Sequence, residues 1–121
     1  MVIELEVQCL ANGLSREQLV IVGEKNFGVS NGGVYIKRGS EGYFEQFVEV
    51  EGGEMFLERN KHFAKLYGER YLNLMNMVLN ENNQVRVFSP DHHFISADCI
   101  HLSRGGAIYF ANLIDWKKYF K

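Results

Sequence analysis

The sequence is poor in the residues that mark several classes of protein. It has one proline, Pro90, and two cysteines, Cys9 and Cys99, among 121 residues. Two cysteines are too few for a disulfide framework, so we expect two free thiols in a reducing compartment. The sequence also lacks the basic region, apolar core and cleavage site of a signal peptide. These absences together predict a cytoplasmic location.

Long apolar runs and an excess of one charge are missing as well. No stretch reaches the roughly 20 apolar residues that a membrane-spanning helix needs, so no membrane span is expected. The formal net charge is only -2, whereas nucleic-acid binders need clustered basic charge. The lysines near the C-terminus, Lys117, Lys118 and Lys121, indicate only a small solvated end. We therefore expect no nucleic-acid partner.

The length of 121 residues predicts one domain over residues 1–121. The apolar fraction of 46% is enough to form its hydrophobic core. The continuous apolar run at 19–23 is typical of a strand in a parallel sheet, and a second short run follows at 34–36. Residues 85–88 alternate like a strand. Helices are predicted over 54–67 and 104–114, with Ser103 as the N-cap of the second. The predicted fold class is α/β, a small two- or three-layer sandwich with a short, mostly parallel sheet.

The first ten residues allow two interpretations. Alternation of apolar residues with Glu4, Glu6 and Gln8 is the pattern of a half-buried strand, and valine and isoleucine favour it. A helical stripe through Val7 and Leu10 fits the same residues. Composition favours the strand.

The most informative stretch is residues 94–107, which places Asp98 and His101 three positions apart in a loop-like segment. A carboxylate beside an imidazole fixes the tautomer of the ring and stabilises its protonated form. On spacing alone, an unrelated surface aspartate and loop histidine explain the pair better, because a bare D-x-x-H pattern is short and common.

The flanking residues add to this pattern. The sequence DCIHLSRGGA at 98–107 resembles the C-terminal catalytic block of the SGNH hydrolase/acyltransferase superfamily, in which D-x-x-H-L-[ST]-x-x-G-A precedes the last helix. The sequence VIVGEKNFG at 20–28 is similar to a strand and loop of SGNH-like domains from bacterial acyltransferases. The resemblance covers residues 19–114, with the middle loosely matched. It implies a partial SGNH, flavodoxin-like domain and favours a short strand at 71–74.

The resemblance implies a role for three residues. His101 would be the general base, Asp98 its orienting carboxylate, and Asn26 the oxyanion-hole asparagine, although the spacing around Asn26 is not the usual G-x-N-D. Members of the family attack acyl esters with a serine, often O-acetyl groups of glycans. The implied substrate is an acylated carbohydrate, and no cofactor or metal is implied.

The sequence departs from the family in its nucleophile. The serine of the family lies in a G-D-S turn well before the segment that matches 19–28, and positions 1–18 contain no such turn here. Ser30 and Ser40 have glycine-rich surroundings but do not match the motif. The chain therefore resembles a truncated SGNH domain, and whether it is an enzyme stays open. If active, it would be a serine esterase or acyltransferase, and alone it is expected to be inactive.

Two alternatives remain. The first is a metal site formed by the cluster Asp91, His92, His93, Asp98, Cys99 and His101, although its spacing matches no standard zinc motif. The second is a non-catalytic binding or assembly module. In that case an exposed sheet edge, supplied by residues 3–9, would pair two copies into a homodimer.

Overall fold

A computed structural model describes residues 2–28 and 38–120. The helices and strands of these residues, in chain order, are α1 (Val2–Ala11), β1 (Ile21–Val22), β2 (Phe47–Glu49), α2 (Gly53–Tyr67), β3 (Tyr71–Leu72), β4 (Gln84–Arg86) and α3 (Arg104–Leu113). Short 3₁₀ turns join several of them, at Arg16–Gln18, Tyr43–Glu45, Gly68–Arg70, Met75–Met77 and Trp116–Lys118. The chain is therefore a small α/β domain, as predicted. The apolar run at 34–36 and Ser30 lie outside the described residues.

The strands form two separate pairs. β1 and β3 are parallel, with Ile21 opposite Tyr71, whereas β2 and β4 are antiparallel, with Val48 opposite Val85. The prediction of a mostly parallel sheet is thus confirmed only for the first pair. The second pair was not foreseen, because its strands are short and its partners, such as Glu49 and Gln84, lie far apart in the sequence.

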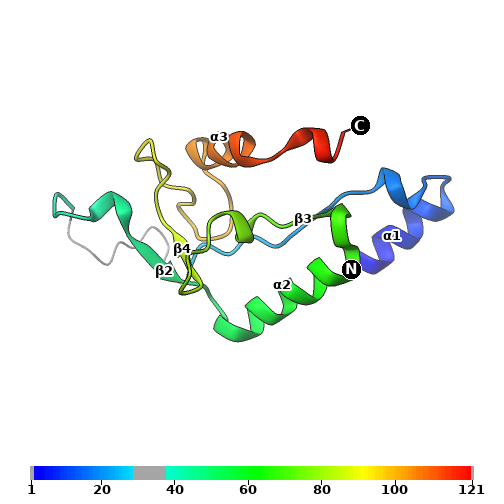
Figure 1. Cartoon of the computed structure of the whole chain (residues 1–121), viewed down its shortest axis with the longest axis horizontal. Helices are drawn as coiled ribbons and strands as arrows, with labels where there is room; N and C mark the ends of the chain where they lie inside the picture. The colour runs from blue at the N-terminus through cyan, green and yellow to red at the C-terminus, as the bar shows by residue number, and fades with distance from the viewer. Residues whose placement is uncertain (1, 29–37, 121) are drawn as a thin grey trace.

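Two helices flank the parallel pair. α2 and α3 lie on opposite sides of β1 and β3, while α1 and the turn after α3 lie toward the same end of the molecule (Figure 1). The core between the helices includes Phe56 of α2, Leu72 of β3 and Phe110 of α3, all buried. This arrangement places the loops after β1 and before α3 close together, because Phe27 N donates a hydrogen bond to the carbonyl oxygen of Cys99 at 2.9 Å.

The helix predictions for 54–67 and 104–114 are confirmed closely. α2 ends at Tyr67, where Gly68 takes a positive φ of 57°, a conformation that favours glycine. α3 begins after Ser103, whose Oγ accepts a hydrogen bond from Gly106 N at 3.0 Å. Both ends are set by the residue types that local signals in the sequence predict.

The strand prediction for residues 2–10 is wrong, since these residues form α1. Glutamate, leucine and glutamine are good helix formers, and the helix turns Glu6 inward. Glu6 Oε1 accepts from Arg16 Nε at 3.3 Å and from Arg70 Nη1 at 3.2 Å. Residues 3–9 therefore supply no edge strand on which a homodimer could be built. Among residues 2–28 and 38–120, no helix is both long and apolar enough to cross a bilayer.

Candidate functional site

The loop before α3 forms a tight turn around the carboxylate of Asp98. Asp98 Oδ1 accepts hydrogen bonds from the backbone nitrogens of Ile100 at 3.0 Å and His101 at 2.7 Å, and from Ser96 Oγ at 3.2 Å. Cys99, between them, has a φ of 69°, which is unusual for a residue other than glycine. The turn therefore holds Asp98 in one orientation through donors that come from its own loop.

Asp98 and His101 form a direct pair, as the resemblance of their flanking residues implies. The distance from His101 Nδ1 to Asp98 Oδ2 is 2.6 Å, while the His101 side chain is 74% exposed. The pKa of Asp98 lies well below its usual range, chiefly because the His101 backbone N–H donates to it, then because of the His101 ring and the Ile100 N–H. Asp98 thus stays ionised and can accept a hydrogen bond from the Nδ1–H of His101. That tautomer leaves the lone pair of Nε2 available to take a proton.

Hydrogen bonds join the two ends of the loop before α3. The backbone nitrogen of Ser103 donates to the carbonyl oxygen of Ile95 at 2.9 Å, and Ser103 Oγ donates to the carbonyl oxygen of Phe94. Gly106 packs so closely on Ile95 that a Cβ there would lie 2.2 Å from the Ile95 carbonyl oxygen. The glycine is therefore required by the close approach of α3 to this loop.

Asn26 lies in the loop that follows β1 and is buried. Its Nδ2 donates to the Glu51 carbonyl oxygen at 2.7 Å, and its Oδ1 accepts from Glu51 N at 2.9 Å and from Gly28 N at 3.3 Å. These bonds tie the loop after β1 to the chain that leads into α2. Asn26 therefore stabilises the contact between these two segments.

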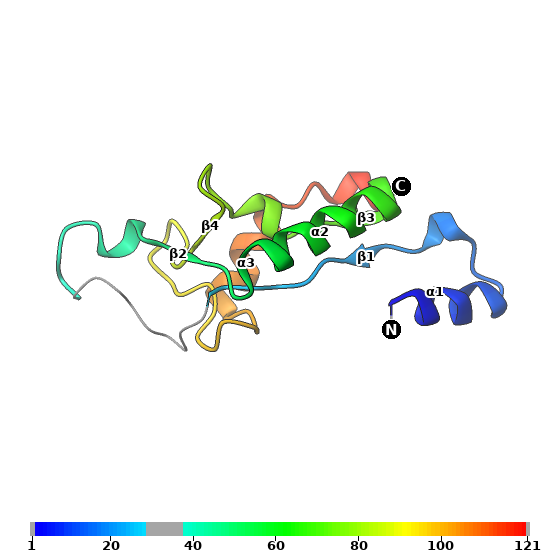
Figure 2. The same ribbon diagram turned by 90° about the horizontal axis from the view of Figure 1, so that it is seen from below.

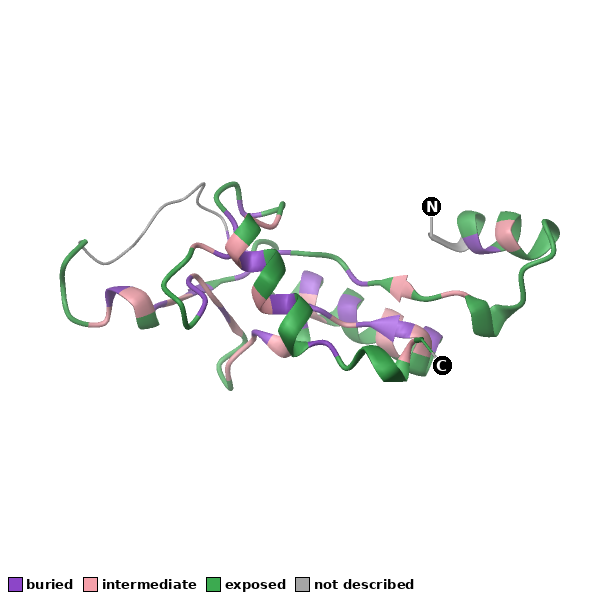
Figure 3. Ribbon diagram, turned by 90° about the horizontal axis from the view of Figure 1, so that it is seen from above, coloured by how far each residue is buried: buried purple, intermediate pink, exposed green. Residues whose placement is uncertain are grey.

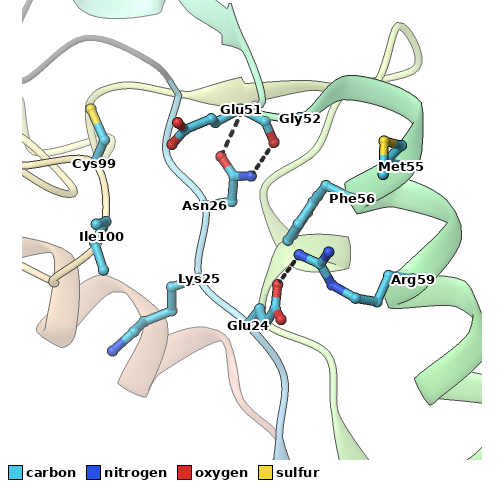
Figure 4. Close-up of a pocket in the computed structure, with 10 residues that line it drawn as sticks. All are labelled: Glu24, Lys25, Asn26, Glu51, Gly52, Met55, Phe56, Arg59, Cys99 and Ile100. Atoms are coloured by element: carbon cyan, nitrogen blue, oxygen red, sulfur yellow. Dashed lines mark hydrogen bonds and ion pairs between the residues drawn. The ribbon is translucent and has the colours of Figure 1, made fainter.

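A pocket of about 350 Å³ lies beside these loops and is lined by Asn26 but not by Asp98 or His101 (Figure 4). It lies between the loop after β1, the N-terminal half of α2 and the loop before α3, and is lined by Glu24, Lys25, Asn26, Glu51, Gly52, Met55, Phe56, Arg59, Cys99 and Ile100. Open α/β sheets place ligands at the carboxyl ends of their parallel strands, and the loop after β1 is such a position. The structure thus brings Asn26 to a shared pocket with the two residues between Asp98 and His101.

The pocket contains groups that sequence reasoning missed. Arg59 Nη2 and Glu24 Oε2 form an ion pair at 2.6 Å, drawn beside the Phe56 ring in Figure 4. Glu24 and Arg59 are 35 residues apart, so no local pattern could have paired them. The lining carries two carboxylates and two cations beside the apolar side chains of Met55, Phe56 and Ile100. Such a pocket suits an uncharged polar ligand with an apolar face.

Within 2–28 and 38–120, no serine hydroxyl is hydrogen-bonded to His101, and Ser96 Oγ donates to Asp98 instead. Ser40 lies exposed, in the turn before β2. The alternative of a metal site formed by histidines and carboxylates finds no support among the described residues. No three His, Cys, Asp or Glu side chains of the described chain are placed to hold a metal.

Comparisons with known proteins add no further assignment. The roles considered for Asp98, His101 and Asn26 depend on the geometry above and on the sequence resemblance. No family model, no curated protein and no solved structure matches this chain.

Proposed function

We propose that this chain supplies the Asp–His half of an SGNH-type site that acts on acyl esters, with acyl esters of glycans as the substrate class. The observation that carries the proposal is the 2.6 Å contact between His101 Nδ1 and Asp98 Oδ2, in a loop braced directly before α3. In this proposal the fold is part of a flavodoxin-like SGNH domain. The parallel pair β1 and β3 would then belong to its central sheet.

Each group has a defined task in the proposed reaction. A serine Oγ bonds to the ester carbonyl carbon while its proton passes to His101 Nε2, and Asp98 stabilises the imidazolium. The same proton then moves to the oxygen of the leaving alcohol. Asn26 Nδ2 carries two hydrogens, and the Glu51 carbonyl accepts one of them. The other is proposed to stabilise the carbonyl oxygen as it becomes negative.

The serine itself is proposed to come from outside the described residues. Ser96 is buried and its hydroxyl donates to Asp98, while the hydroxyl of Ser103 accepts from Gly106 N at the start of α3. Both hydroxyls are therefore already hydrogen-bonded within the chain. The chain alone is therefore expected to be a poor esterase. His101 is still expected to react directly with an activated ester, since an exposed imidazole with a free Nε2 is a nucleophile.

Hydrolysis of p-nitrophenyl acetate tests this expectation on the chain as it exists. Nε2 attacks the acetyl carbon, p-nitrophenolate leaves, and water hydrolyses the acetylimidazole. The sequence has four histidines, and we expect His101→Ala to remove most of the rate. His62→Ala is the matched control, because His62 is an exposed histidine of α2 that pairs with no carboxylate among the described residues.

Equal rates in wild type, His101→Ala and His62→Ala would contradict the proposal, because the Asp98–His101 pair would then have no distinctive reactivity. A loss in both variants of similar size would contradict it in the same way. Folding of each variant is checked by circular dichroism.

The substrate class is tested separately by binding. Isothermal titration with an O-acetylated xylo-oligosaccharide, against the same sugar after deacetylation, should show tighter binding of the acetylated form. Ile100→Asp should weaken that binding, because Ile100 lines the pocket and is 55% exposed. Equal affinity for both sugars would contradict the assignment to acyl esters.

A further inference from the structure

The pocket between the loop after β1 and α2 lies beside the Asp98–His101 pair rather than over it. Ile100 lines the pocket, and Figure 4 shows Ile100 on one side of Asn26 and Arg59 on the other. A substrate whose ester carbonyl lies at Asn26 would therefore extend across the pocket toward Arg59. The groups on that far side are charged, so they suit hydroxyl groups better than an apolar acyl chain.

The far side of the pocket carries the ion pair of Glu24 with Arg59. α2 runs alongside the segment that contains β1 (Figure 2), so Arg59 on α2 reaches Glu24 in the loop after β1, with 2.6 Å between Arg59 Nη2 and Glu24 Oε2. The guanidinium carbon of Arg59 also lies 5.7 Å from the centre of the Phe56 ring, a contact that favours this orientation of the cation. Two separate contacts thus hold Arg59 at the pocket wall.

The ion pair keeps hydrogen-bonding groups that a ligand can reach. Glu24 belongs to an exposed stretch after β1, just before the chain becomes buried at Asn26 (Figure 3). The side chains of Arg59 and Glu24 are 48% and 52% exposed. Their contact uses one nitrogen and one oxygen, and Arg59 Nη1 and Glu24 Oε1 have no other hydrogen bond among the described residues. The pair therefore offers a donor and an acceptor side by side.

The charges of the lining favour an uncharged ligand. Glu24 and Glu51 supply two negative charges, and Lys25 and Arg59 supply two positive ones, so an anion and a cation would each meet charges of their own sign. A sugar hydroxyl is uncharged and can both donate and accept a hydrogen bond. The apolar C–H face of a sugar ring can in addition pack on Ile100, which is exposed in the pocket.

We propose that the Glu24–Arg59 pair binds two neighbouring hydroxyls of one sugar ring and so selects the carbohydrate part of the substrate. One hydroxyl donates to Glu24 Oε1, and the next accepts from Arg59 Nη1. Hydrogen bonds to charged groups are stronger than those between neutral groups, so both contacts contribute to specificity. The inference rests on the proposed function for the glycan as substrate and adds the residues that recognise the sugar.

The test is isothermal titration with xylotriose, which carries no acyl group. Glu24→Gln and Arg59→Gln should each weaken its binding by roughly tenfold, the usual effect of losing a hydrogen bond to a charged group. Fully O-methylated xylotriose has no hydroxyl to donate to Glu24, so wild type should bind it more weakly than xylotriose. Glu58→Gln and Lys61→Gln are the matched controls, because Glu58 and Lys61 form an exposed ion pair on the same helix and do not line the pocket.

Half-exposed ion pairs contribute little to folding, so the variants should fold, and circular dichroism verifies that they do. A wild-type chain that binds no xylotriose, or that binds both sugars equally, would overturn the proposal. Unchanged affinity for xylotriose in Glu24→Gln or in Arg59→Gln would overturn it as well.

The outcome is separable from that of the proposed acyl-ester chemistry, because p-nitrophenyl acetate contains no sugar. A rate that depends on His101 without any binding of xylotriose would overturn only the role of the Glu24–Arg59 pair. Binding of xylotriose that depends on Glu24 and Arg59, without a rate that depends on His101, would support the sugar site and contradict the esterase proposal.

Discussion

At the scale of single residues, the central feature is an aspartate whose charge is fixed by its own loop. Three of the hydrogen bonds that Asp98 accepts come from residues two or three positions away in the sequence. A carboxylate that accepts backbone N–H bonds is held in its charged form. Asp98 therefore orients His101 without help from a distant part of the chain.

This charge makes the stability of the protein depend on pH in a defined direction. The folded pKa of Asp98 is depressed, so its stabilisation is full above the unfolded value of about 3.9 and is lost as the pH falls toward the folded value. Asp98→Asn should lower the melting temperature at neutral pH. The gap to wild type should shrink below about pH 4, as followed by circular dichroism. A gap that is constant with pH would contradict this account.

Gly106 is the second residue on which the loop depends. In Gly106→Ala the new Cβ would meet the Ile95 carbonyl, so α3 must move away from the loop. We expect the free energy of unfolding to fall by about 1–3 kcal/mol, the usual cost of overpacking, in urea denaturation. Asn112→Ala, an exposed change on α3, is the control and should have little effect.

At the scale of elements, the N-cap of α3 also supports the site. Ser103→Ala removes the acceptor for Gly106 N and the donor to Phe94 O. The loss of an N-cap costs about 1 kcal/mol, which urea denaturation would detect. Ser103→Thr keeps a hydroxyl and should retain most of the stability. If both variants lose the same amount, the hydroxyl is not what stabilises this helix start.

The position of α1 depends on a different kind of contact. Glu6→Gln removes the charge that Arg16 and Arg70 share, and Glu6 is itself buried. We expect faster amide hydrogen exchange throughout α1 and little change in α2 and α3, since the latter pack on the core. Glu17→Gln is the control, because Glu17 is exposed and takes part in no ion pair within the described residues. Unchanged exchange in α1 would show that the Glu6 cluster does not hold the helix.

At the scale of the whole molecule, sequence reasoning succeeded where short-range signals decide the structure. Ser103 marked the start of α3, and Gly68 marked the end of α2. The contact of Asp98 with His101 was implied by the resemblance of their flanking residues, whereas their spacing alone did not favour it. Sequence reasoning failed for α1, where one apolar pattern fits both a strand and a helix. The contact that turns Glu6 inward, to Arg70, joins residues 64 positions apart and could not be read from that pattern.

The pocket could not be foreseen for the same reason. The bonds between Asn26 and Glu51 join residues 25 apart, and the ion pair of Glu24 with Arg59 joins residues 35 apart. Pattern and composition contain no information on such pairings. The resemblance named Asn26, but its bonds to Glu51, which fix its side chain, became visible only in the folded chain.

Because the turn at Asp98 is built from contacts between neighbouring residues, it affects the order in which the protein folds. Contacts between close neighbours in sequence form fast, because little loop-closure entropy opposes them. By contrast, the bond from Phe27 N to the Cys99 carbonyl, which joins the turn to the pocket, connects two distant parts of the sequence. During folding, the turn should therefore place His101 against Asp98 before this bond joins the loop to the pocket. The base is oriented early, and its position beside the pocket is set only when the distant parts of the chain meet.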